Sequence, residues 1–130
     1  MSEKIVILGA GESGCGTALL AKKQGFQVFV SDQGSISQSA KNIFDTLEIE
    51  WEEETHTLSK MQDAQYIMKS PGIPHQAPLV QSLEASNIPV ISEIEFASKY
   101  TKATLIGITG SNGKTTTAMM TYKILDDAGF

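Results

Sequence analysis

The sequence predicts an α/β protein built on a doubly wound, mainly parallel sheet. Short apolar runs alternate with segments of helical spacing, and the first run ends in a glycine-rich turn. Several of these runs are almost continuously apolar, which is typical of parallel strands that helices cover on both faces. The composition of 41% hydrophobic and 19% charged residues is that of a globular chain with one well-filled core.

The alternation is regular along the chain, with helices expected between most strands. Strands are expected at Lys4–Leu8, Val28–Ser31, Glu48–Trp51, Tyr66–Met68, Val90–Ile91 and Thr104–Ile108, and helices at Gly14–Gln24, Ser37–Leu47, Pro78–Asn87 and Thr116–Asp127. Ser37 is a suitable N-cap, and Gly25 is expected to end the first helix.

The pattern loosens around Ser92–Lys102, which is expected to be a short helix or a linker. We therefore predict a Rossmann-like domain over residues 1–95, then a linker and the start of a second domain over 96–130. This second piece offers one strand, one loop and one helix, and these cannot bury their own apolar faces. Exposed Met119 and Met120 would favour self-association or disorder of this piece. Alternatively, Thr104–Ile108 is a sixth strand of the first sheet.

The charge balance excludes some partners. A net charge of −5 argues against binding nucleic acid or a membrane surface, which requires clustered Lys and Arg. Small molecules are the expected ligands. No apolar run is long enough for a membrane span, so a cytoplasmic location is expected. The one cysteine, Cys15, is expected to be a small packing residue in the first helix.

The first glycine-rich turn has the pattern Gly9-x-Gly11-x-x-Gly14 and lies between a strand and a helix. Gly9 allows a tight turn, Gly11 lets a phosphate approach the backbone, and Gly14 lets the helix pack closely on the strand. Asp32 ends the second strand, where its carboxylate could accept hydrogen bonds from a ribose or base. This pattern fits an NAD(P)-binding oxidoreductase as well as another nucleotide-diphosphate site.

A second loop lies near residue 110 and has the Gly-Lys-Thr core of a P-loop, although Ile108 stands where the strict pattern has glycine. In such loops the lysine neutralises phosphate charge and the hydroxyl binds Mg²⁺, so Lys114 and Thr115 are the candidate catalytic residues, with Thr115 as the metal ligand. The expected ATP-binding residues are Gly110, Ser111, Asn112, Gly113, Lys114, Thr115 and Thr116.

Other polar residues receive plainer interpretations. The turn Ser70–Pro74 follows a strand and is expected at the carboxyl edge of the sheet, where ligands bind in such folds. His75 beside it is expected to be an exposed loop residue. His56 lies in an acidic stretch without partners at metal-ligand spacing, and we expect it on the surface.

The string Gly-Ile-Thr-Gly-Ser-Asn-Gly-Lys-Thr-Thr-Thr at 107–117 resembles the ATP loop of the Mur ligase family, the ATP-dependent amide-forming enzymes of peptidoglycan precursor synthesis. Together with this loop, the Gly9–Gly14 turn, Ser70–Pro74 and Glu93–Glu95 look like the member that adds D-glutamate to UDP-N-acetylmuramoyl-L-alanine. The resemblance implies contacts to the UDP part from Gly9, Gly11, Glu12, Ser13, Gly14, Asp32, Gln33, Ser70, Pro71 and Gly72.

In this family ATP phosphorylates the substrate carboxylate, and the amino group of D-glutamate then attacks the acyl phosphate. The resemblance implies that ATP and Mg²⁺ bind at Lys114 and Thr115. The resemblance covers the whole chain but only about the first third of a complete ligase, so the chain is expected to be inactive alone. The complete protein is expected to be a monomer. Two alternatives remain open: an NAD(P)-dependent oxidoreductase domain and a nucleotide-sensing module without catalysis.

Overall fold

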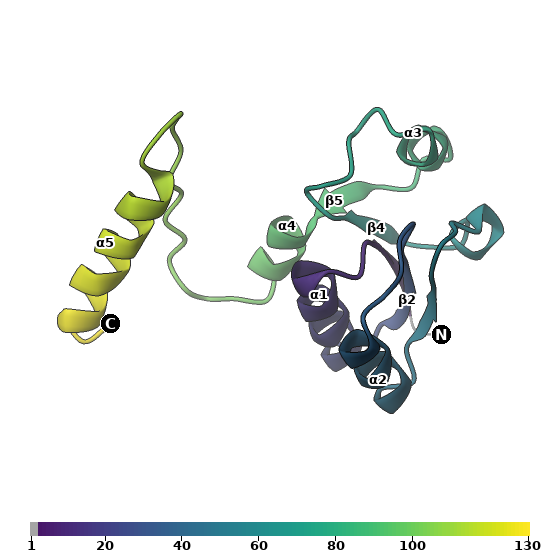
Figure 1. The fold of residues 1–130 in the computed structure, drawn as a ribbon, viewed down its shortest axis with the longest axis horizontal. Coiled ribbons are helices and arrows are strands. Elements are labelled where there is room, and N and C mark those ends of the chain that lie inside the picture. Colours follow the sequence, from purple (N-terminus) through teal and green to yellow (C-terminus); the bar gives the residue numbers. More distant parts are fainter. Residues whose placement is uncertain (1–2) are drawn as a thin grey trace.

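A computed structural model describes residues 3–130 of the chain. Its core is a five-stranded sheet in the order β3-β2-β1-β4-β5, in which every pair of neighbours is parallel. The strands are β1 Lys4–Leu8, β2 Gln27–Ser31, β3 Glu50–Glu52, β4 Tyr66–Lys69 and β5 Val90–Ser92 (Figure 1). This arrangement confirms the predicted α/β class and five of the predicted strands, with boundary shifts of at most two residues.

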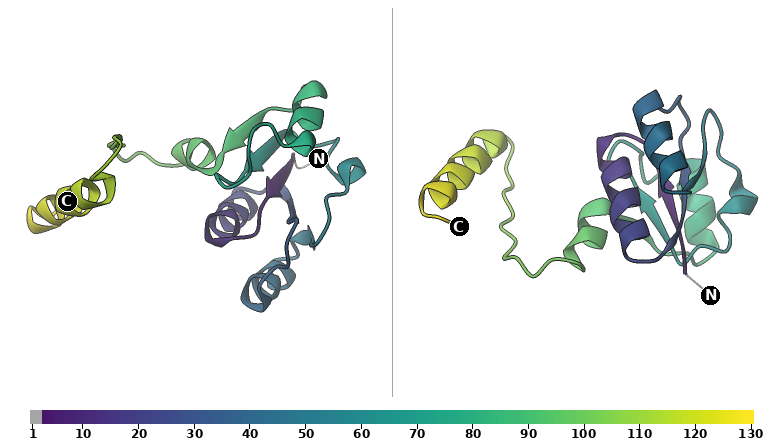
Figure 2. Two further views of the ribbon diagram at one scale, coloured as in Figure 1. Left: turned by 45° about the horizontal axis from the view of Figure 1, so that its top comes forward. Right: turned by 90° about the horizontal axis from the view of Figure 1, so that it is seen from below.

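Helices lie on both faces of this sheet (Figure 2). They are α1 Glu12–Lys23, α2 Gln38–Thr46, α3 Pro78–Ala85, α4 Glu93–Ser98 and α5 Lys114–Asp127, with a 3-10 turn at Leu58–Lys60. Buried residues of α1, α2 and α4 share one core cluster, and buried residues of α3 share the other. The sheet is therefore doubly wound.

The central strand β1 explains why its sequence reads as continuously apolar. Ile5 and Ile7 belong to the core cluster on one face, whereas Val6 and Leu8 belong to the cluster on the other. Successive side chains of a strand point to opposite faces, so a strand covered on both sides needs apolar residues at every position. All of these residues are fully buried.

The predicted ends of the first two helices are confirmed. The hydroxyl of Ser37 accepts a hydrogen bond of 3.3 Å from the backbone N–H of Ala40 and caps α2. Gly25 follows the last residues of α1 with a φ of +86°, a left-handed conformation that glycine adopts at little cost.

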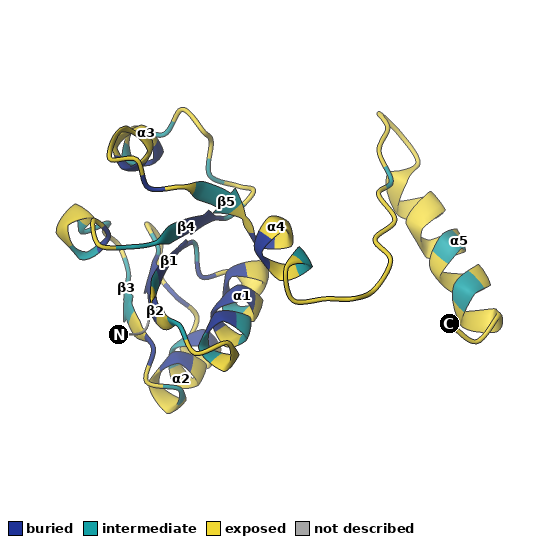
Figure 3. Cartoon of the chain, turned by 180° about the vertical axis from the view of Figure 1, so that it is seen from behind, coloured by how far each residue is buried: buried dark blue, intermediate teal, exposed yellow. Residues whose placement is uncertain are grey.

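The alternative that Thr104–Ile108 adds a sixth strand to the first sheet is wrong, and the expected strand does not form in this chain. The assignment of this segment to the start of a second domain stays a prediction. This segment forms no strand and is almost wholly exposed in the structure (Figure 3). A strand needs a neighbour for its backbone hydrogen bonds, and β5, the edge strand nearest in sequence, has no partner other than β4 among the described residues. The helix that was expected next does form, as α5.

Between β5 and this segment lies α4, whose Phe96 is 1% exposed and packs in the first core cluster. Its ring makes edge-on contacts with Phe26 and Tyr100, with ring centres 6.0 and 5.0 Å away. The first folded unit therefore includes α4, which extends past the predicted domain boundary between residues 95 and 96. The assignment of the residues after α4 to a second domain stays a prediction.

Candidate functional site

A cavity of about 750 Å³ opens at the carboxyl edge of the sheet. It lies where β2 and β4 flank β1 and the chain crosses to opposite faces, the position at which open α/β sheets bind ligands. The residues that line it are Gly9, Gly11, Asp32, Gln33, Glu54, Thr55, His56, Ser70, Gly72, Ile73, Pro74, Ala77, Pro78 and Leu79.

The glycine turn that begins this edge depends on the absence of side chains. Gly9 has a φ of +102°, and a Cβ there would lie 2.9 Å from the Cβ of Ser70. A Cβ on Gly14 would lie 2.0 Å from the carbonyl oxygen of Gly9, so α1 approaches β1 more closely than any side chain allows. At Gly11 a Cβ would meet nothing within 4 Å, which leaves its backbone open to the cavity.

Asp32 connects the first two loops through its carboxylate. One oxygen accepts the backbone N–H of Ala10 at 2.6 Å, and the other accepts that of Gly34 at 2.8 Å. Asp32 also lines the cavity, and its contact with a ribose or base stays a prediction. In this structure its carboxylate holds the backbone of the two loops that contain Ala10 and Gly34.

The loop after β3 forms a wall of the cavity that the sequence interpretation missed. His56 was expected on the surface, and this is wrong: the imidazole is half-buried and lines the cavity beside Glu54 and Thr55. Its Nδ1 lies 2.7 Å from the hydroxyl of Ser31 at the end of β2. The acidic residues before His56 suggested a solvated turn. However, β3 is parallel to the other strands, so the loop at its carboxyl end lies at the same edge of the sheet as the cavity.

Burial also shifts the pKa values of His56 and Glu52, which lie in or beside this wall. It lowers the pKa of His56 below its usual value, although the negative charges of Glu52 and Asp32 act in the opposite direction. Burial raises the pKa of Glu52, but hydrogen bonds from Thr57 and Ser31 and the charge of Lys60 outweigh it and leave that pKa below its usual value.

The structure brings together six of the ten residues predicted for the UDP part: Gly9, Gly11, Asp32, Gln33, Ser70 and Gly72. The other four lie around the cavity. Gly14 is buried beneath the turn, and Glu12 lines a neighbouring hollow between α1 and α2. The hydroxyl of Ser13 donates to Glu93 at 3.0 Å, and Pro71 lines a third hollow with Lys69 and Glu95.

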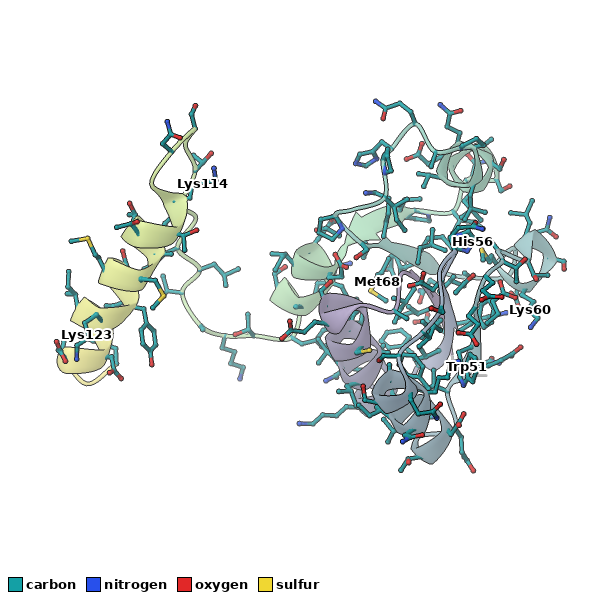
Figure 4. The ribbon with its side chains drawn as sticks, viewed as in Figure 1. Trp51, His56, Lys60, Met68, Lys114 and Lys123 are labelled. Atoms are coloured by element: carbon teal, nitrogen blue, oxygen red, sulfur yellow. The ribbon has the colours of Figure 1, made fainter. Side chains whose placement is uncertain are left out.

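The second loop precedes α5 and lies apart from the cavity, as the labelled Lys114 and His56 show (Figure 4). Gly110 and Gly113 have φ values of +150° and +77°, and the Lys114 ammonium donates to the carbonyl of Gly110 at 2.6 Å. All of the predicted ATP-binding residues are exposed. Residues 3–130 contain no cluster of three His, Cys, Asp or Glu side chains suited to a metal ion.

A doubly wound parallel sheet with a glycine turn and a cavity at its switch point defines a Rossmann-like domain. Comparison with known proteins narrows this class. Residues 4–78 match the MurD N-terminal domain, and the chain belongs to that family.

Two curated relatives are similar along almost the whole chain. UDP-N-acetylmuramoylalanine--D-glutamate ligase of Christiangramia forsetii is 54% identical over 99% of the chain, and that of Bacteroides thetaiotaomicron is 54% identical over 97%. The chain spans only 29% and 28% of the length of these relatives.

Solved structures of Mur-type ligases share the fold. A pseudomurein peptide ligase type C from Methanothermus fervidus is 32% identical with a TM-score of 0.67, and covers 98% of this chain with 27% of its own. A murein peptide ligase from Psychrobacter arcticus is 25% identical with a TM-score of 0.70, again over 98% of this chain and 27% of its own. In the part of the chain that is described, no helix is long and apolar enough to cross a bilayer.

Proposed function

We propose that this chain provides the substrate domain and the ATP loop of a ligase that adds D-glutamate to UDP-N-acetylmuramoyl-L-alanine. The first domain binds the UDP part of that substrate, and residues 110–116 bind ATP. Two relatives that are 54% identical carry this name, which supports the choice of amino acid and of substrate. We further propose a cytoplasmic location for the complete ligase.

The observation that carries this proposal is the convergence of three loops on one cavity. Gly11, Asp32 and Ser70 follow three different strands, yet all line the same 750 Å³ space. The start of α1 directs backbone N–H groups and the positive end of its dipole toward this edge, which suits a diphosphate. Glu12 is exposed beside the turn, so we assign the diphosphate to backbone N–H groups and not to this carboxylate.

The catalytic contribution of the chain lies in the first turn of α5. Lys114 would neutralise charge on the transferred phosphoryl group of ATP, while the Thr115 hydroxyl is a hard oxygen donor of the kind Mg²⁺ prefers. Bound Mg²⁺ would stabilise the negative charge that develops on the phosphate oxygens. Thr115 is the one metal ligand that we propose from this loop.

The test is a calorimetric titration of the chain with UDP-N-acetylmuramoyl-L-alanine, UDP and NADH. We expect both uridine compounds to bind and NADH not to bind. The matched variants are Gly11→Ala, which should weaken UDP binding at least tenfold, and Gly107→Ala, which should not. Neither added methyl meets an atom of the protein within 4 Å, so both variants should fold. Binding of NADH in place of UDP would refute the proposal.

The oxidoreductase alternative is not favoured, because the relatives and the solved neighbours reported above are ligases. The alternative of a nucleotide sensor without catalysis has no observation in its favour beyond the glycine turn. Loss of ligation in the Lys114→Ala variant of the complete protein, with UDP binding unchanged, would distinguish a ligase from a sensor. Activity that survives this substitution would argue against the assigned role of Lys114.

A further inference from the structure

The wall formed by Glu54, Thr55 and His56 plays no part in the function proposed above. Yet it lines the same cavity as the glycine turn, and its imidazole is held in place. Within residues 3–130 the ring of His56 makes one hydrogen bond, through Nδ1 to the Ser31 hydroxyl at 2.7 Å. Its other nitrogen, Nε2, has no hydrogen bond among the described residues and is not one of their buried unpaired atoms, so a ligand can reach it.

The protonation of Nδ1 follows from the bonds around Ser31. The hydroxyl of this fully buried residue lies 2.8 Å from Oε1 of Glu52 and 3.3 Å from the carbonyl oxygen of Thr55. Both are acceptors, and a hydroxyl has one proton to donate. If that proton served His56 instead, the oxygens of Ser31 and Glu52 would face each other at 2.8 Å with no proton between them.

The Glu52 carboxylate is well suited to take this proton. The same Oε1 accepts the backbone N–H of Thr57 at 2.7 Å, and Lys60 lies 3.7 Å from Oε2. These contacts favour the ionised form, which accepts hydrogen bonds and donates none. Ser31 therefore donates to Glu52, and Nδ1 of His56 donates to Ser31. A neutral imidazole with its proton on Nδ1 has an unprotonated Nε2.

We propose that Nε2 of His56 accepts a hydrogen bond from the nucleoside of the bound substrate, from either N3–H of uracil or a ribose hydroxyl. This inference rests on the proposed function, because it requires that the cavity hold a uridine nucleotide. It makes His56 a specificity residue, while Ser31 and Glu52 position its ring and fix its tautomer.

Among the described residues, His56 differs from other acceptors in the cavity because a side-chain hydrogen bond to Ser31 holds its ring. In this part of the chain no such bond holds the acceptor side chains of Gln33, Glu54, Thr55 and Ser70. Both oxygens of Asp32 already accept backbone N–H groups, from Ala10 and Gly34. Ile73 and Leu79 also line the cavity and offer apolar surface to a flat base. A base that is held by apolar contacts alone is not identified, so a fixed acceptor adds selection. Uracil presents N3–H, whereas cytosine presents a lone pair at the same position and would be repelled.

The experiment compares UDP, CDP and 2′-deoxy-UDP by calorimetry with the wild-type chain, His56→Phe and His56→Gln. Phe cannot accept a hydrogen bond, so UDP affinity should fall about tenfold, in line with one lost bond to a buried acceptor. Gln retains an acceptor and should lose less. If uracil is the donor, His56→Phe also loses the preference for UDP over CDP; if the ribose is the donor, it loses the preference for UDP over 2′-deoxy-UDP.

The outcomes separate the two proposals. A wild-type chain that binds no uridine compound would overturn the proposed function and this inference with it. Binding of UDP by His56→Phe within twofold of wild type would overturn the inference alone. A readout that needs no variant is the ¹⁵N spectrum of the imidazole near neutral pH. We expect the proton on Nδ1, and a proton on Nε2 would refute the assignment of the acceptor.

Discussion

The hydroxyl of Ser13 donates a hydrogen bond of 3.0 Å to the carboxylate of Glu93, which is 7% exposed. Ser13 lies in the first turn of α1, next to the glycine turn, and Glu93 is the first residue of α4. The bond therefore joins the proposed diphosphate loop to the helix that leads into the linker. It also occupies the one proton of a hydroxyl that the family resemblance assigns to the substrate.

Replacing Ser13 tests what this bond contributes. Ser13→Ala would leave a buried carboxylate without its donor, and we expect the free energy of unfolding to fall by roughly 1–3 kcal/mol. Urea denaturation measures this change. Ser82→Ala is the control, because its exposed hydroxyl bonds only to a carbonyl of its own helix, and it should change the stability by less than about 0.5 kcal/mol. Equal effects of the two substitutions would show that the Ser13 bond contributes nothing.

The close approach of α1 to β1 predicts opposite effects at two glycines of one helix. In Gly14→Ala the new methyl would lie 2.0 Å from the carbonyl oxygen of Gly9, so the helix must shift. We expect a loss of about 3 kcal/mol in urea denaturation, at the upper end for overpacking. In Gly16→Ala the methyl meets nothing within 4 Å, and the higher helix propensity of Ala should stabilise the fold by up to ~1 kcal/mol. A Gly14→Ala variant as stable as wild type would contradict the observed packing.

The lowered pKa of His56 predicts how stability depends on pH. Because the ring resists protonation when folded, the unfolded chain binds more protons as the pH falls through about 6.5, the usual value for His. The free energy of unfolding should therefore decrease as the pH falls from 7.5 to 5.5. The lowered pKa of Glu52 acts in the same direction, but only at more acidic pH.

Urea denaturation at several pH values measures this dependence in the wild-type chain and in His56→Gln. Glutamine does not titrate, so the variant should show a shallower decrease between pH 7.5 and 5.5. His75→Gln removes the other histidine, which lies in an exposed loop, and is the matched control. Identical slopes for wild type and His56→Gln would show that burial of this ring does not affect its protonation.

Much of the fold could be predicted because it follows from local patterns. The continuous apolar run of β1, the Ser37 cap and the Gly25 end each reflect one local requirement, and all three are confirmed. Thr104–Ile108 has the same apolar composition as a strand, yet it forms none. Whether an apolar run becomes a strand depends on a neighbour, and the run itself does not reveal whether one is present.

The residues that line the cavity could be predicted where a motif follows the end of a strand, as at Gly11, Asp32 and Ser70. His56 was missed because no motif surrounds it and because four glutamates nearby suggested a solvated turn. Its position depends on the hydrogen bond between its Nδ1 and Ser31, 25 residues earlier in the chain, and a contact of this range leaves no pattern in a single sequence. The rule that the carboxyl ends of parallel strands share one edge, applied also to β3, could have found it.

The exposed segment before α5 should show its lack of structure in amide hydrogen exchange. The backbone N–H groups of Thr104–Ile108 belong to no strand or helix, so they should exchange nearly as fast as in an unfolded chain. The amides of Ile5–Ile7 in the central strand are the internal reference and should be among the slowest. Protection of Leu105 and Ile106 comparable to that of Ile7 would indicate that this segment finds a strand partner in solution, for instance in a second copy.

The buried Lys69 side chain holds the loop at one side of the cavity through its ammonium group. Its Nζ donates to the carbonyl oxygen of Ile73 at 2.5 Å and to that of Ser70 at 3.3 Å, while the residue is 9% exposed. These bonds fix the turn from Ser70 to Pro74, which gives several residues to the cavity. Two charge-assisted bonds to carbonyls compensate for the removal of the ammonium from water.

Lys69→Met keeps the length of the side chain and removes both donors. We expect the free energy of unfolding to fall by about 1–2 kcal/mol, less than two charged bonds would suggest, because the burial of a charge is also relieved. UDP should bind several-fold more weakly, since the loop that lines the cavity is no longer held. Lys23→Met, on the exposed end of α1, is the control and should change neither quantity. A more stable Lys69→Met variant would mean that the desolvation of the ammonium outweighs the stabilisation from its hydrogen bonds. Unchanged UDP affinity in that variant would mean that the turn keeps its shape through Pro71 and Pro74 alone.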